Sequence, residues 1–128
     1  NILISDGGQA CLADFGLALA VESQALSTSS AGSTRGTLRW LAPEILDSSR
    51  KAERQTSLTK RDIYAFGCTI LEIYTGSRPF PHLQDVEVIH SVVTKRERPE
   101  IPTNAVTELK DLHPLLKCCW HNNPRQRP

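Results

Sequence analysis

The tripeptide Asp14-Phe15-Gly16 places a carboxylate directly before an aromatic residue and a glycine. Residues 9–13 before it favour a strand, and Gly16 allows a sharp turn, so that Asp14 would stand at a strand end. A carboxylate is a preferred oxygen ligand of Mg²⁺, the cation that bridges nucleotide phosphates in phosphoryl transfer. Taken alone, however, the tripeptide also fits an ordinary turn, and only further motifs can decide between the two interpretations.

Four such motifs accompany it in a fixed order: Asn1-Ile2-Leu3-Ile4, Ala42-Pro43-Glu44, Asp62-Ile63-Tyr64-Ala65-Phe66-Gly67, and Cys119-Trp120 with Pro124-Arg125-Gln126-Arg127-Pro128. With this order and spacing the chain resembles the second half of a eukaryotic protein kinase domain, in which D-F-G and A-P-E bracket the activation segment. The resemblance implies a mainly α fold of the α+β family. We expect the helical C-terminal lobe of a protein kinase domain, with a short β-hairpin near the metal site.

The same resemblance implies that residues 1–128 form a partial protein kinase domain. It runs from the end of the catalytic loop through the C-terminal lobe, and the small lobe and last helix are missing. The Gly-rich loop, the V-A-I-K lysine and the H-R-D aspartate do not occur in the sequence. We therefore assign no catalytic residue, and we expect the isolated chain to be inactive.

Asn1 and Asp14 match the family residues that hold Mg²⁺ and, through it, ATP. They are 13 positions apart, which suits two strands joined by a tight turn and would bring both side chains to one metal site. Without the resemblance, Asn1 is an unremarkable asparagine. The expected cofactors are ATP and Mg²⁺, and the expected partner is a protein substrate.

Residues 36–44, Gly-Thr-Leu-Arg-Trp-Leu-Ala-Pro-Glu, form the most specific block. In the family this stretch forms the surface on which the substrate peptide lies. We assign the following residues to the activation segment: Asp14, Phe15, Gly16, Thr37, Ala42, Pro43 and Glu44. The threonine is typical of serine/threonine kinases, whereas the tryptophan is shared with tyrosine kinases and the tyrosine-kinase-like group. We predict a tyrosine-kinase-like member specific for Ser and Thr, with dual specificity left open.

The hydroxyl-rich stretch 23–34 is a candidate regulatory region, with Thr28, Ser33 and Thr34 as candidate phosphorylation sites. A phosphate there would order the segment by pairing with an arginine. An unregulated loop is the alternative.

Several residues have structural roles in the family. Glu44 and Arg127 resemble the partners of a buried ion pair, the alternative being two exposed charges. Asp62 resembles an aspartate that accepts backbone N–H groups of the catalytic loop, and it also suits a helix cap. Gly67 costs its helix about 1 kcal/mol relative to alanine, which indicates close packing of another segment, and Trp120 belongs to the same structural set.

Local patterns predict the elements that position these residues. Residues 1–5 and 9–13, joined by Asp6-Gly7-Gly8, predict a hairpin, and residues 17–19 a short third strand. Pro43 begins a short helix to residue 46. The polar residues 47–58 predict a surface loop, and an insertion relative to shorter family members.

Three helices follow. The clearest one begins at Thr59, which forms a capping-box pattern with Asp62, and it ends before Gly76. Its core-facing stripe is predicted to contain Ile63, Phe66, Gly67, Ile70, Leu71 and Tyr74. The second helix covers 85–94, with Val86, Ile89 and Val93 on its inner face. The third covers 112–119, and the basic residues Lys95, Arg96 and Arg98 between them are expected to be solvated.

Composition narrows the class of protein. A net charge of +1 disfavours nucleic acid as a partner, and no apolar run is long enough for a membrane span. The four cysteines form no C-x-x-C pair and the four histidines have no zinc spacing, which indicates reduced thiols in a cytoplasmic or nuclear protein. The absence of methionine indicates a processed chain or, as we expect, a fragment.

Two other interpretations stay open: a non-catalytic, kinase-like interaction module (a pseudokinase), and a truncated product that does not fold. The sequence does not indicate the oligomeric state.

Overall fold

The computed structural model describes residues 2–13, 37–50, 52–53, 58–102 and 110–128. The chain divides into two compact units, Asn1–Gly32 and Ser33–Pro128, which are described separately below.

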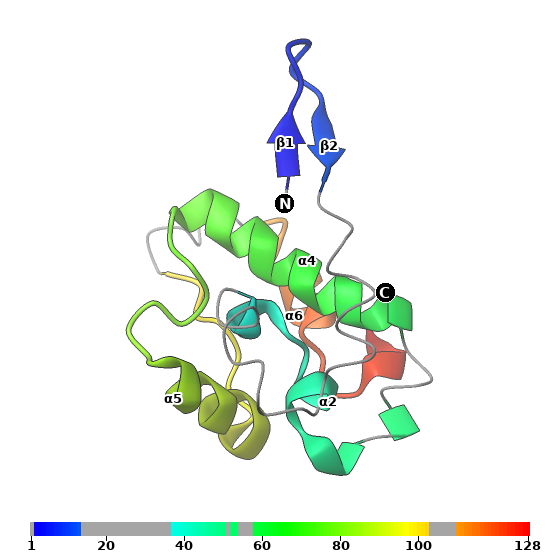
Figure 1. Cartoon of the computed structure of the whole chain (residues 1–128), viewed down its shortest axis with the longest axis vertical. Helices are drawn as coiled ribbons and strands as arrows, with labels where there is room; N and C mark the ends of the chain where they lie inside the picture. The colour runs from blue at the N-terminus through cyan, green and yellow to red at the C-terminus, as the bar shows by residue number, and fades with distance from the viewer. Residues whose placement is uncertain (1, 14–36, 51, 54–57, 103–109) are drawn as a thin grey trace. The chain divides into compact units, whose positions relative to one another are not determined.

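The described part of the first unit is an antiparallel hairpin (Figure 1) of β1 (Ile2–Ile4) and β2 (Ala10–Leu12). Its register pairs Ile2 with Leu12 and Ile4 with Ala10. The turn is closed by the Ser5 N–H, which donates to the Gln9 carbonyl at 2.9 Å, and Gly8 takes a left-handed backbone angle, φ 77°. The hairpin is therefore as predicted, while the expected strand 17–19 lies outside the described residues.

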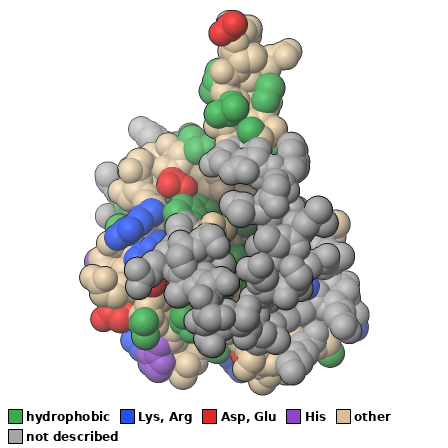
Figure 2. All heavy atoms as spheres, in the orientation of Figure 1, with side chains coloured by type: hydrophobic (Ala, Val, Ile, Leu, Met, Phe, Trp, Pro, Cys, Tyr) green, Lys and Arg blue, Asp and Glu red, His purple; other side chains and the backbone are tan. Residues whose placement is uncertain are grey.

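Both strands of the hairpin expose apolar side chains. Figure 2 shows hydrophobic groups gathered along it, and four large side chains are exposed: Ile2, Leu3, Ile4 and Leu12. An isolated two-stranded hairpin is marginally stable in water, so these strands require further packing to be stable.

The second unit is helical (Figure 1), and its longest element is α4 (Leu58–Thr75). Helix α6 (His113–Cys119) packs against α4. Together with Ala42, the two helices form the main core, whose buried members are Ala42, Tyr64, Cys68, Leu71, Leu116, Cys119 and Trp120. Ala42 is also the N-cap of the short helix α2 (Pro43–Leu46), so the start of α2 adjoins this core. Helix α2 has the bounds predicted from Pro43.

A second, smaller core lies under α5 (Asp85–His90) and the π-helical turn η3 (Ser91–Lys95) that continues it. Its buried members are Phe80, Val88 and Val92. The helix was predicted over nearly the same residues, but its inner face was predicted only in part: Ile89 and Val93 are half-buried, whereas Val86 is 78% exposed and Val88 is buried.

The buried face of α4 matches the predicted stripe only in part: Gly67 and Leu71 are buried and Ile63 and Ile70 pack against the core, as expected. Tyr64, Cys68 and Leu71 face the core at i, i+4 and i+7, whereas Phe66 is 54% exposed and Tyr74 is 45% exposed. The helix carries apolar residues on more than one face, so periodicity alone cannot choose the one that α6 covers. Gly76 ends the helix as expected, with φ 65° and its N–H donating to the Glu72 carbonyl at 2.8 Å.

The start of α4 corrects two expectations. Because the helix already includes Leu58, Thr59 is inside it and cannot be its N-cap. The loop predicted over 47–58 contains a 3₁₀ turn, η2 (Ser48–Arg50). Its half-buried Arg50 donates to the carbonyl of Asn122 at 2.8 Å. This hydrogen bond connects η2 with the C-terminal residues of the chain.

The C-terminal residues form α6 and the 3₁₀ turn η4 (Pro124–Gln126). Asn123 caps η4 by accepting the Arg125 N–H at 3.0 Å. Across the described residues, no helix is long and apolar enough to cross a membrane.

Candidate functional site

The described part of the predicted activation segment is segment 37–44, which consists of Thr37, the 3₁₀ turn η1 (Leu38–Trp40), Leu41, Ala42 and the first two residues of α2. Neither short helix could hold its shape alone, because isolated helices below about 12 residues are marginal in water. The segment is instead held by three side chains that contact other elements: Glu44, Arg39 and Trp40.

Glu44 forms the deepest of these contacts. Its two carboxylate oxygens accept hydrogen bonds from the two terminal nitrogens of Arg127, at 2.7 and 2.8 Å. Both side chains are fully buried. Arg127 also donates to the carbonyls of His121 and Lys60, each at 2.9 Å. The pair expected from the resemblance is thus bidentate, buried and supported by further acceptors, which are the conditions under which such a pair is retained.

Arg39 is the second contact and is also buried, with 4% exposure. Its guanidinium donates to the carbonyls of Pro79, Phe80 and Leu83 at 3.1, 2.6 and 2.6 Å, and to the Asp85 carboxylate at 2.9 Å. This single side chain therefore joins segment 37–44 to the loop before α5.

Trp40 forms the third contact. Its indole N–H donates to the carboxylate of Glu72 on α4 at 3.2 Å, and this hydrogen bond is partly buried. Thr37 itself is exposed. The segment thus leaves Thr37 exposed, while Arg39, Trp40 and Glu44 are held by contacts with other elements.

Gly67 lies where α4 meets the end of α6. A β-carbon at this position would stand 2.8 Å from the Trp120 indole nitrogen and 2.9 Å from the Cys119 β-carbon. The glycine therefore allows a close approach, as its position in the helix indicated, and Trp120 is buried against it with 3% exposure.

Two arginines flank the buried ring of Tyr64, with the guanidinium carbons of Arg127 and Arg98 at 5.3 and 5.9 Å from its centre. Burial, aided by the neighbouring Cys68, raises the pKa of the Tyr64 hydroxyl far above its usual range, although both arginines oppose this shift. Burial likewise raises the pKa of Cys68 to about 12. Both groups are therefore neutral near pH 7 and serve packing rather than proton transfer.

Arg98 was expected to be solvated, and the structure corrects this. Its guanidinium donates to the Trp120 carbonyl at 2.8 Å and to the Asn122 side chain at 3.1 Å. Desolvation is the main cause that lowers its pKa, and the nearby Arg127 and Arg50 lower it further. Arg98 therefore connects the 95–102 segment with the end of α6 through hydrogen bonds.

The structure places only part of the predicted site. Asp62 is exposed on α4. Seven predicted residues lie outside the described part of the chain: Asn1, Asp14, Phe15, Gly16, Thr28, Ser33 and Thr34. In the sequence, Asn1 directly precedes β1, and Asp14 stands two positions after the end of β2.

Within the described ranges, no cluster of three or more His, Cys, Asp or Glu side chains could hold a metal. The residues proposed as ligands, Asn1 and Asp14, carry an amide and a carboxylate oxygen, which are the donors that Mg²⁺ prefers.

Sequence reasoning missed Arg39 and Glu72 as contacts of segment 37–44. Their partners lie 40 and 32 residues away along the chain, and no local pattern points to them. An arginine between two apolar residues in a motif was the only available signal for Arg39.

Comparison with known proteins was made against family models and curated sequences. The model of the protein tyrosine and serine/threonine kinase family matches residues 1–128. The chain is 33% identical over 128 residues to the serine/threonine/tyrosine-protein kinase HT1 of Arabidopsis thaliana, covering 100% of this chain and 30% of that protein.

Two further relatives show the same pattern. The identity is 35% over 129 residues with mitogen-activated protein kinase kinase kinase 3 of Arabidopsis thaliana, covering 100% of this chain and 19% of that protein. It is 30% over 129 residues with the serine/threonine-protein kinase BCK1/SLK1/SSP31 of Saccharomyces cerevisiae, covering 100% and 8%. The chain thus spans less than a third of the length of these curated relatives.

Proposed function

The chain belongs to the protein tyrosine and serine/threonine kinase family, and on that premise we propose that it is part of a protein kinase domain. The intact parent transfers the γ-phosphoryl group of ATP to Ser or Thr hydroxyls of protein substrates. Segment 1–128, which has no H-R-D or V-A-I-K motif, is inactive by itself. The match over every residue of the chain is the observation that carries this proposal.

Segment 37–44 is the proposed substrate surface. Phosphoryl transfer depends on positioning more than on covalent chemistry by the protein. A surface that positions a peptide must itself be rigid, and here Glu44, Arg39 and Trp40 each contact a different element. This arrangement supports the proposed role, while the exposed Thr37 is free to meet the substrate.

Asn1 and Asp14 are the proposed Mg²⁺ ligands, and through the metal they bind ATP. The bound cation would neutralise charge that develops on the transferred phosphoryl group. The contribution of this chain is to supply an amide oxygen from Asn1 and a carboxylate oxygen from Asp14.

The finer assignments are part of the same proposal. Thr37 and Trp40 together favour the tyrosine-kinase-like group, and relatives named as serine/threonine and as serine/threonine/tyrosine kinases both match. We assign Ser/Thr specificity, activation-segment phosphorylation at Thr28, Ser33 or Thr34, and a cytoplasmic or nuclear location.

The test uses the full-length parent protein, [γ-³²P]ATP, Mg²⁺ and a degenerate peptide array. We expect phosphate on Ser and Thr peptides, lost on addition of EDTA. Asp14→Asn should abolish transfer, whereas the matched variant Asp6→Asn, an exposed aspartate in the hairpin turn, should behave as the parent does.

Two results would overturn the proposal. Label on tyrosine peptides only would contradict the specificity. No transfer and no Mg²⁺-dependent ATP binding by the intact parent would favour the non-catalytic interaction module instead.

A further inference from the structure

Arg39 directs all of its hydrogen bonds to one short loop and the helix that follows it. One terminal nitrogen donates to the carbonyls of Pro79 and Phe80, and the other donates to the Leu83 carbonyl and the Asp85 carboxylate. Only a planar guanidinium presents donors in this forked geometry, so lysine could satisfy part of the set but not all of it. Such a set is more than a solvated surface charge would require.

The loop that Arg39 binds has an uncommon backbone conformation. Phe80 has φ 53°, in the left-handed region that bulky residues rarely occupy. Such a conformation persists only where the surroundings impose it. Here the ring is buried against Val88 and Val92, and the Phe80 carbonyl accepts the short bond from Arg39 at 2.6 Å.

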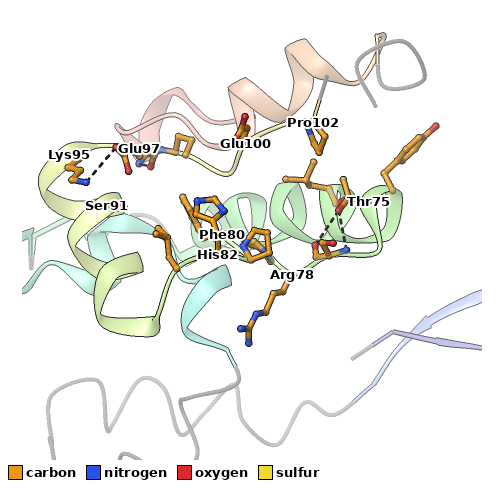
Figure 3. A pocket seen from close by; sticks show the side chains of 16 residues that line it. Thr75, Arg78, Phe80, His82, Ser91, Lys95, Glu97, Glu100 and Pro102 are labelled. Atoms are coloured by element: carbon orange, nitrogen blue, oxygen red, sulfur yellow. Dashed lines mark hydrogen bonds and ion pairs between the residues drawn. The ribbon is translucent and has the colours of Figure 1, made fainter. Parts of the chain in front are cut away.

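The three residues whose carbonyls accept from Arg39 also line a groove of about 920 Å³. The groove is bounded by the end of α4, the loop and the 95–102 segment. Figure 3 shows Phe80 in the middle of the lining, with Glu100 on one side and Arg78 on the other. Arg39 therefore connects segment 37–44 with the wall of this groove.

We propose that Arg39 is a positioning residue for the protein substrate. It locks segment 37–44 to the loop before α5, so that the segment keeps the form in which it receives the substrate. The inference rests on the proposed kinase function. It adds a residue through which the loop and α5 act on substrate binding, although Arg39 itself contacts neither ATP nor metal in this scheme.

The experiment compares four forms of the full-length parent protein: the parent, Arg39→Ala, Arg39→Lys and the matched control Arg125→Ala, which removes an exposed arginine. KM and kcat are measured with myelin basic protein and separately with ATP. Hydrogen exchange of residues 77–90 is measured by mass spectrometry on the same samples, since it reports the loop without relying on activity.

For Arg39→Ala we expect a rise in KM for myelin basic protein of about tenfold or more, because small misplacements of a substrate surface are costly. KM for ATP should stay within about twofold, and residues 77–90 should exchange faster. Arg39→Lys should recover part of the loss, and Arg125→Ala should match the parent.

An unchanged KM for the protein substrate, with only the active fraction or the melting temperature lowered, would overturn the inference and leave Arg39 a structural residue. If Arg39→Ala does not fold, Arg39→Lys decides the question by the same readouts. A parent that is inactive toward every substrate would instead overturn the proposed function, and this inference with it.

Discussion

The buried pair of Glu44 and Arg127 allows a quantitative prediction for Arg127→Ala. Both side chains have no exposed surface and share two hydrogen bonds, of 2.7 and 2.8 Å. Removing the arginine takes two hydrogen bonds and their positive charge away from a buried carboxylate, which costs about 3–5 kcal/mol. The carbonyls of His121 and Lys60 lose a donor as well, so the upper half of that range is expected.

A loss of this size is a large share of the roughly 5–15 kcal/mol that stabilises a typical domain. With a urea m-value of about 2 kcal/mol per molar, a loss of 4 kcal/mol lowers the unfolding midpoint by about 2 M. We would follow urea unfolding of the intact kinase domain by fluorescence, for the parent, for Arg127→Ala and for the control Arg125→Ala. The control should shift by less than about 0.5 kcal/mol.

A double variant separates the charge from the packing. Glu44→Leu with Arg127→Met keeps apolar volume in both places and leaves no buried charge, so it should recover much of the loss of Arg127→Ala. If Arg127→Ala instead costs below about 1 kcal/mol, as exposed pairs do, the pair is not buried in solution and the reasoning from its exposure is wrong.

Three further predictions concern the core around α4. Gly67→Ala should lower stability by about 1–2 kcal/mol despite the better helix propensity of alanine, because its β-carbon would stand 2.8 Å from the Trp120 nitrogen and 2.9 Å from the Cys119 β-carbon; Trp120→Phe should relieve the first of these contacts, and so part of the loss, in a double-mutant cycle by urea unfolding, and a stabilised single variant would contradict the geometry. Tyr64→Phe should be neutral or stabilising by up to about 1 kcal/mol, since the buried hydroxyl has no hydrogen-bond partner among the described residues; a loss above about 1 kcal/mol in the same assay would show a partner. Because burial raises the pKa of Cys68 from 9.0 to about 12, its contribution is complete below pH 9 and is lost as the pH rises toward 12; stability against pH should fall less steeply in Cys68→Ala, and equal slopes would contradict the shift.

Local signals were sufficient for the elements whose ends are set by special residues. Pro43 fixed the start of α2, and the Asp6-Gly7-Gly8 turn fixed the hairpin. Gly76 marked the end of α4 because a left-handed residue there releases the chain from the helix. In each case the decisive interaction is within a few residues, and the sequence contains all of it.

Helix faces could be predicted only in part, because they depend on what packs against the helix. The predicted stripe of α4 included Phe66 and Tyr74, which are exposed, and left out Tyr64 and Cys68, which are buried. Tyrosine and cysteine rank below phenylalanine and isoleucine in a search for apolar periodicity. They face the core here because α6 approaches on their side, at the glycine that leaves room for Trp120.

Charged residues with distant partners were equally hidden from sequence reasoning. Arg98 stands in a basic, proline-containing stretch that is typical of a solvated surface. Its acceptors are the Trp120 carbonyl and the Asn122 side chain, 22 and 24 residues later. Backbone carbonyls leave no mark in the sequence, so a half-buried arginine that binds them cannot be distinguished from an exposed one.

The same distances determine how segment 37–44 acquires its form. Its three contacts reach residues 32 to 83 positions later in the chain, and the two short helices within it cannot persist alone. The segment can therefore take its described form only after α4, the loop before α5 and the end of the chain have assembled around it. Contacts of such separation form late and are lost together. It follows that variants at Arg39 or Arg127 should disturb the proposed substrate surface before they unfold the helices that hold it.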